Sequence, residues 1–154
     1  MKERLANIYK RFGVLRLLRY AAETTVAATA LLFFRLLPLD TASALGGRIL
    51  QAIGPHLKRS SEVALPQMEK AFPDMDEAEK KRLVGAMWNN LGRIFAEYAH
   101  LDKMASRVTV VGAEYIEEAK QSGQPIIFHC AHLGNWEIVS VALRAKGIDL
   151  HVVY

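Results

Sequence analysis

The chain has 154 residues, of which 51% are hydrophobic, and carries a formal net charge of +4 with a pI near 9.3. This length suits about one domain, and the apolar content argues against a disordered chain. The only cysteine, Cys130, excludes an intrachain disulfide and is typical of a reducing compartment. The basic balance indicates an anionic partner, which could be nucleic acid, a membrane surface or an acidic carrier protein.

Residues 1–39 join a basic flank to an apolar segment that begins at Thr24. We expect no cleaved signal peptide, because no clean small-residue cleavage site follows the apolar part. The charge-free run 24–34 covers roughly 16 Å of helix, against a hydrocarbon core of about 30 Å. We therefore expect a membrane anchor that either lies in the interface or spans with its flanking charges at the edges. The alternative is an ordinary buried core helix.

Residues 40–104 carry helical signals throughout. Short helices are expected over 41–53 and 61–71, and a long helix begins after Asp76, which forms a capping box with Glu79. One buried stripe is expected along the long helix, formed by Leu83, Met87, Leu91, Ile94, Phe95 and Tyr98. On the same helix Arg93 and Glu97 lie four residues apart, a spacing typical of a surface ion pair.

Residues 105–154 alternate between strand and helix patterns. Strands are expected at 107–111, 125–128 and 148–154, with helices at 113–121 and 136–147 between them. Such alternation predicts an α/β sheet with right-handed crossovers. The predicted fold class is therefore α/β with α+β character: a membrane-associated helix, a helical region, and the first βαβαβ part of a sheet. Three strands make a thin sheet, so this last domain looks truncated.

The sequence HLGNWE, from His132 to Glu137, lies between the second expected strand and its helix. Residues five apart do not share a helical face, but a strand-to-helix turn can fold them toward each other. Gly134 gives the turn backbone freedom, and Asn135 is a good N-cap for a helix that begins at Trp136. The carboxylate can then fix the imidazole tautomer and leave the other ring nitrogen as a general base.

Two other interpretations of these residues stay open. As a metal site, His129, His132 and Glu137 offer suitable ligands, but their spacing matches no standard zinc pattern. As structural residues, His132 can be a hydrogen-bonded core histidine and Glu137 a first-turn acid favoured by the helix dipole. Spacing alone does not separate this interpretation from catalysis. We expect His129 to serve packing or to support the motif from behind its contacting residues, and Cys130 to be a small buried hydrophobe.

HLGNWE resembles the His-x4-Asp/Glu motif of the glycerolipid-type acyltransferase superfamily. With Asn-Trp before the acid, it resembles the branch of lipid A biosynthesis acyltransferases (lauroyl/myristoyl type). Upstream segments agree in order with that branch: an apolar anchor ending RLLPLD, then AFPDMDEAEKKRL, NNLGRIFAEY and VVGAEYIEEA. The resemblance therefore covers almost all of the chain.

The resemblance implies transfer of a fatty acyl chain from acyl carrier protein to a hydroxyl of a lipid A precursor, at the cytoplasmic face of a bacterial inner membrane. It makes His132 the general base and Glu137 its orienting partner, while Gly134, Asn135 and Trp136 shape a substrate-binding turn. It implies no metal, no organic cofactor and no nucleic acid partner. Members of the family continue past position 154, so we expect the N-terminal part of an acyltransferase. The alternative is an inactive fragment or a non-enzymatic, membrane-associated binding module.

Overall fold

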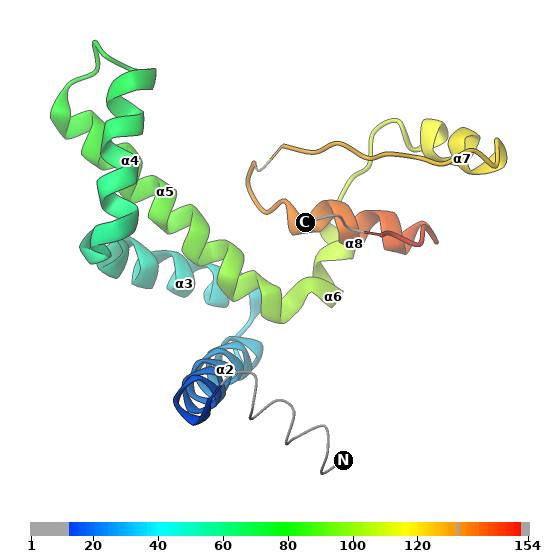
Figure 1. Ribbon diagram of the computed structural model, residues 1–154. Helices are drawn as coiled ribbons and strands as arrows, with labels where there is room; N and C mark the ends of the chain where they lie inside the picture. The colour runs from blue at the N-terminus through cyan, green and yellow to red at the C-terminus, as the bar shows by residue number, and fades with distance from the viewer. Residues whose placement is uncertain (1–12, 132, 152–154) are drawn as a thin grey trace.

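The computed structural model describes residues 13–131 and 133–151, without the side chains of 58–61. Within these residues the chain is a succession of helices (Figure 1). The α-helices are α2 (Val14–Arg35), α3 (Leu39–Ile53), α4 (Lys58–Ala71), α5 (Glu77–Glu97), α6 (Leu101–Met104), α7 (Ala113–Gln121) and α8 (Glu137–Ala145). Short 3-10 turns connect some of them: η1 (Gly54–His56), η2 (Tyr98–His100) and η3 (Ala105–Arg107).

The core of the molecule is an antiparallel pair of helices, α3 and α5 (Figure 1). Helix α5 begins as predicted, with the Asp76 carboxylate accepting a hydrogen bond from the backbone N–H of Glu79 (2.9 Å). Glycines allow the two helices to approach closely: a Cβ on Gly46 would lie 2.5 Å from the carbonyl oxygen of Gly92. The indole of Trp88 lies directly over Gly54 in the same way.

The buried face of α5 differs from the predicted stripe. Val84, Trp88 and Ala96 are buried, whereas Met87 and Phe95 expose 45% and 52% of their surface. Ile94, a member of the predicted stripe, is buried as expected, with 2% of its surface exposed. The other buried residues follow a four-residue spacing that passes through Gly92, because the closest contact with α3 is made by small side chains. The prediction followed the large apolar residues of α5. The close contact between Gly92 and Gly46 instead turns a neighbouring face of the helix toward α3.

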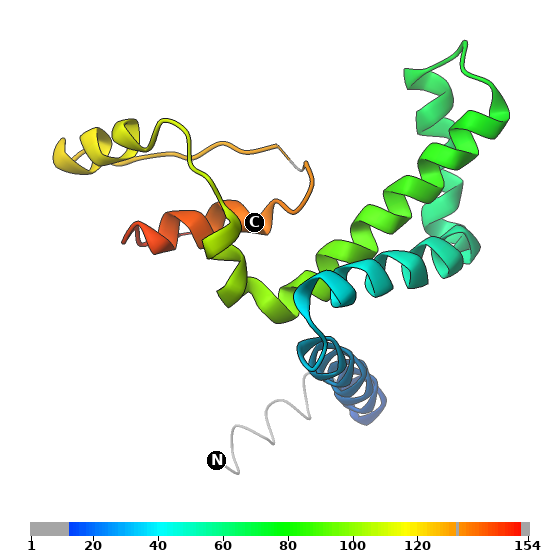
Figure 2. The ribbon, with the colours of Figure 1, turned by 180° about the vertical axis from the view of Figure 1, so that it is seen from behind.

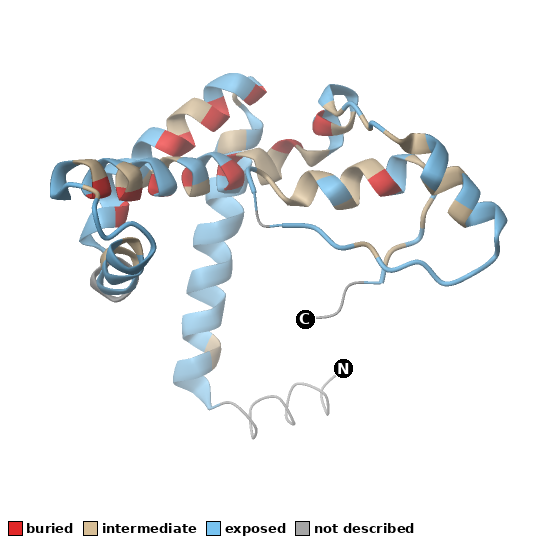
Figure 3. Ribbon diagram, turned by 90° about the horizontal axis from the view of Figure 1, so that it is seen from above, coloured by how far each residue is buried: buried red, intermediate tan, exposed pale blue. Residues whose placement is uncertain are grey.

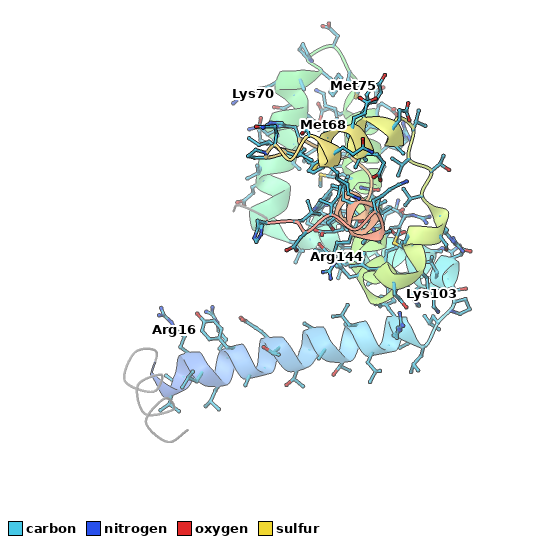
Figure 4. All side chains as sticks on the ribbon, turned by 90° about the vertical axis from the view of Figure 1, so that its right-hand side faces the viewer. Arg16, Met68, Lys70, Met75, Lys103 and Arg144 are labelled. Atoms are coloured by element: carbon cyan, nitrogen blue, oxygen red, sulfur yellow. The ribbon has the colours of Figure 1, made fainter. Side chains whose placement is uncertain are left out.

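Helix α2 stands apart from this pair, and none of its residues is buried (Figure 3). Its side chains project around the whole helix, with Arg16 at the end far from the rest of the molecule (Figure 4). At 22 residues it is about 33 Å long, close to the thickness of a hydrocarbon core of about 30 Å. It begins ten residues earlier than the expected apolar segment, and by length and composition it is able to cross a membrane.

The C-terminal end of α2 is fixed to η2 and α6, the two elements that follow α5. The guanidinium of Arg35 donates to both carboxylate oxygens of Asp102 (2.5 and 2.9 Å) and to the carbonyl oxygen of Ala99 (2.7 Å). The buried His100 donates from Nε2 to the carbonyl oxygen of Phe34 (2.9 Å). A helix without buried residues is thus attached to the body at its last turn.

The predicted α/β fold is wrong for the residues that the structure describes. None of 13–131 or 133–151 forms a β-strand, so there is no βαβαβ sheet in these ranges. The segments expected at 107–111 and 125–128 run as irregular chain (Figure 2). In these segments Val111 is 92% and Ile127 80% exposed. A β-strand forms only when a neighbouring strand completes its ladder of backbone hydrogen bonds. No described segment forms such a ladder with 107–111 or with 125–128.

Candidate active site

The turn that carries the motif leads directly into α8. Gly134 has a φ of +56°, in the left-handed region where glycine is favoured, as the turn was expected to require. The side-chain oxygen of Asn135 accepts a hydrogen bond from the backbone N–H of Glu137 (3.2 Å), and its carbonyl accepts from Ile138 (3.2 Å). The helix therefore begins at Glu137, one residue later than predicted. His132 lies outside the described residues.

Glu137 is half-buried and its carboxylate is held by a residue from a distant part of the chain. The hydroxyl of Tyr98, in the turn that follows α5, donates to Oε1 of Glu137 (2.7 Å). Its second oxygen, Oε2, has no hydrogen-bond partner among the residues that the structure describes. The carboxylate of the predicted pair is thus fixed at Oε1 by a residue outside the motif.

Asn135 is attached to α5 as well. Its side-chain amide donates to Oε2 of Glu97 (2.7 Å), while Oε1 of Glu97 accepts from the hydroxyl of Ser43 (2.7 Å). Ser43 is only 6% exposed and also accepts from the guanidinium of Arg93 (3.2 Å). Arg93 and Glu97 therefore meet through Ser43 and not as the surface ion pair that their spacing indicates. Trp136, between the two attached residues, is half-buried.

An apolar groove of about 380 Å³ lies beside α8. Ile138, the residue after Glu137, lines it together with Leu143 on the same helix. The irregular segments before α8 supply most of the remaining wall, including Val108, Val110, Phe128 and His129. His129 and Cys130 are both exposed, so the expectation that Cys130 is buried is wrong. Outside the undescribed positions, no three His, Cys, Asp or Glu side chains lie close enough to hold a metal ion.

Comparison with known proteins gives a clear family. The family model of the bacterial lipid A biosynthesis acyltransferases matches residues 10–154. The chain belongs to this family. It is 26% identical over 113 residues to the lipid A biosynthesis myristoyltransferase of Escherichia coli (strain K12) and, with the same figures, to the lipid A biosynthesis acyltransferase 1 of Shigella flexneri.

Those alignments cover 70% of this chain and 34% of each relative, so the chain spans about a third of the length of the curated relatives it matches. No solved structure matches the chain.

Sequence reasoning missed three residues of this family member's candidate site: Ser43, Glu97 and Tyr98. Periodicity placed Tyr98 in a buried stripe and Glu97 in a surface pair, because it reports the face of one helix and no contact with another segment. The sequence did contain a signal for two of the three, because Glu97 and Tyr98 end the segment NNLGRIFAEY, which carries part of the family resemblance. Polar residues that close such a segment are candidates for contact with the motif.

Proposed function

We propose that this chain carries the catalytic turn of an acyltransferase that moves a fatty acyl chain from acyl carrier protein to a hydroxyl of a lipid A precursor. Family membership and the names of the two relatives support the reaction class. The observation that carries the assignment of the site is the carboxylate of Glu137, which is half-buried, fixed at Oε1 by Tyr98 and open at Oε2 among the described residues. It lies five residues after His132.

In this proposal the imidazole of His132 takes the proton from the acceptor hydroxyl while the hydroxyl oxygen attacks the carbonyl carbon of the thioester. The tetrahedral intermediate collapses with cleavage of the C–S bond. The thiolate of the carrier's prosthetic group leaves and takes the proton from the imidazolium. Glu137 keeps the imidazole in one tautomer and stabilises the imidazolium between the two proton transfers. No acyl-enzyme intermediate forms.

The groove beside α8 suits the acyl chain of the donor in this scheme. Its lining is mostly aliphatic and aromatic, and about 380 Å³ is within the range of small-molecule pockets, roughly 300–1,000 Å³. Ile138, which lines the groove, follows Glu137 in the chain, so the groove begins one residue after the proposed orienting carboxylate. His129 lies at the same groove and is available for contact with the donor.

The proposed location is the cytoplasmic face of the bacterial inner membrane, with α2 as the membrane contact. The exposed apolar side chains of α2, such as Leu18, Val26 and Leu32, favour lipid over water. A span with the basic N-terminal flank on the cytoplasmic side would place the motif on the opposite side from a cytosolic carrier protein. We therefore propose an interfacial or re-entrant anchor.

The proposal is tested by acyl transfer in detergent. The chain, and an extended form that continues to the length of its relatives, are incubated with labelled acyl carrier protein and a lipid A precursor. We expect labelled acyl product and free carrier thiol in equal amounts. Because general base catalysis contributes about 10²–10⁴-fold, His132→Ala should lower the rate by roughly that factor. The exposed His56, in η1, gives the control His56→Ala, which should transfer like the unmodified protein.

Two results would contradict the proposal. Transfer by His132→Ala at the unmodified rate would show that His132 is not the general base and that the motif has only a structural role. Binding of the carrier or of lipid vesicles by both forms without any transfer would instead support a non-enzymatic binding module.

A further inference from the structure

We propose that Tyr98 is a positioning residue of this acyltransferase: its hydroxyl fixes one oxygen of the Glu137 carboxylate, so that the carboxylate serves the proposed general base in a single orientation. The inference rests on the function proposed above. It adds to that function a residue 34 positions before the motif, which neither the family resemblance nor the spacing of the motif assigns.

The contact between Tyr98 and Glu137 has the geometry of a charge-assisted hydrogen bond. The distance from the hydroxyl oxygen to Oε1 is 2.7 Å, and both side chains are half-buried. Tyr98 continues the backbone geometry of α5, with φ −52° and ψ −33°, so its position is set by the helix that packs against α3. Its ring stacks on Phe95 with 6.4 Å between the centroids, which restricts the side chain further.

A second attachment, next to Tyr98 in sequence, holds the same turn. Glu97 accepts from the side chain of Asn135, two residues before Glu137 (2.7 Å), and its other oxygen accepts from Ser43. Because both oxygens of Glu97 are engaged, this carboxylate cannot rotate to serve the motif in another way. Neighbouring residues at the end of α5 thus hold positions 135 and 137, which fixes both the place and the orientation of the turn.

The chemistry of a tyrosine suits this role. A phenol hydroxyl donates one hydrogen bond and carries no charge near pH 7, so it orients the carboxylate without neutralising it. A lysine or arginine at the same place would pair with the carboxylate and compete with the imidazolium that forms during transfer. With Oε1 held by Tyr98, the proposal assigns the contact with the general base to Oε2.

The test is Tyr98→Phe in the acyl-transfer assay, with the same extended protein used above. Removing a hydrogen bond to a charged group should lower kcat by about tenfold to a hundredfold. Since the bond orients a group that acts in the transition state, the KM for acyl carrier protein should stay within about twofold. Tyr115, which is 70% exposed on α7, supplies the matched control Tyr115→Phe, which should not change kcat.

A double-mutant cycle separates positioning from general stability. In the Glu137→Gln background the Tyr98→Phe substitution should lower kcat by less than about twofold, because it acts only through the carboxylate. Substitution of Tyr98 by 4-aminophenylalanine, which restores an N–H donor at the same place, should recover most of the lost kcat. Urea unfolding of each variant shows whether Tyr98→Phe is folded. If it is not, the 4-aminophenylalanine variant still tests whether a donor at this position supports kcat.

The outcomes are distinguishable. If His132→Ala abolishes transfer but Tyr98→Phe keeps the unmodified kcat, or if its effect multiplies with that of Glu137→Gln, the role of Tyr98 is overturned and the proposed function stands. If the unmodified protein transfers nothing, or if His132→Ala transfers normally, the proposed function is overturned and the positioning role with it.

Discussion

The helix pair α3 and α5 and the region from Ala105 onward are held together by different forces. The pair makes close backbone contacts at Gly46 and Gly92, with Trp88 packed over Gly54. In the described residues after Ala105, Leu143 is the only buried large apolar side chain. That region is attached to the helix pair and the turn after α5 by side-chain hydrogen bonds: Arg107 donates to Asp40, Asn135 donates to Glu97, and Tyr98 donates to Glu137.

The difference indicates where stability lies and where the proposed chemistry lies. Burial of an apolar side chain is worth about 1.5–3 kcal/mol, whereas a typical hydrogen bond contributes only about 0.5–1.5 kcal/mol net. The helix pair should therefore unfold last, and the turn that carries the motif should open at a lower free-energy cost. The position of the candidate site depends on a few polar contacts at one end of α5.

The largest effect is expected from Gly92→Ala. A Cβ at this position would collide with the carbonyl oxygen of Gly46 and lie 2.7 Å from Cβ of Leu50, so the two helices must separate. We expect the free energy of unfolding to fall by about 1–3 kcal/mol, measured by urea denaturation.

Gly85→Ala is the matched control on the same helix. A Cβ there meets only the side-chain nitrogen of Gln51 at 3.8 Å, so the better helix propensity of alanine should raise the free energy of unfolding by about 0.5–1 kcal/mol. Equal effects of the two substitutions would mean that the close approach of α3 and α5 is not what holds the pair.

A smaller effect is expected from Glu97→Ala. This substitution leaves the amide of Asn135 and the buried hydroxyl of Ser43 without their acceptor, at a cost of about 1–2 kcal/mol. Hydrogen exchange should also become faster at the backbone amides of 133–138, because one of the two attachments of the turn is lost.

Glu69→Ala, at an exposed position of α4, should change neither the free energy of unfolding nor exchange in the turn. If exchange at 133–138 were the same in the Glu97→Ala protein as in the unmodified one, the turn would be held by something other than α5.

The smallest effect concerns the attachment of α2. The hydrogen bond from Arg35 lowers the pKa of Asp102 from 3.8 to about 2. Because the folded pKa is below the unfolded one, this contact stabilises the attachment above about pH 4 and is lost as the pH falls toward 2. Hydrogen exchange in the last turn of α2 should accelerate over that window. Asp102→Asn should remove the pH dependence of this exchange. The control Asp74→Asn, at an exposed position, should leave it unchanged.

Local features of the fold followed from the sequence. The cap at Asp76, the helix at Ala113–Gln121 and the turn glycine Gly134 each depend on a few neighbouring residues, and each is present. The expected strands depend on partners elsewhere in the chain. Their apolar patterns describe a segment suited to a sheet but cannot supply the neighbouring strand, and the described chain contains none.

The same reason separates the predicted part of the site from the missed part. Glu137 and Asn135 were found because they lie within a six-residue motif, whereas Tyr98 and Glu97 reach the turn across 38 or 39 positions. Contacts at that separation are set by how α5 and α8 are placed, which no local pattern reports.

The central claim is that the imidazole of His132 meets the carboxylate of Glu137. It is tested most directly by ¹⁵N NMR of the ring nitrogens of His132, assigned with His132→Ala and recorded at one pH for the unmodified protein, Glu137→Gln and the exposed-site control Glu114→Gln. We expect one dominant tautomer in the unmodified and control proteins, and a changed tautomer balance in Glu137→Gln, because the amide no longer accepts in the same way. Identical ring signals in all three proteins would show that Glu137 does not orient His132, and the proposed pair would be wrong.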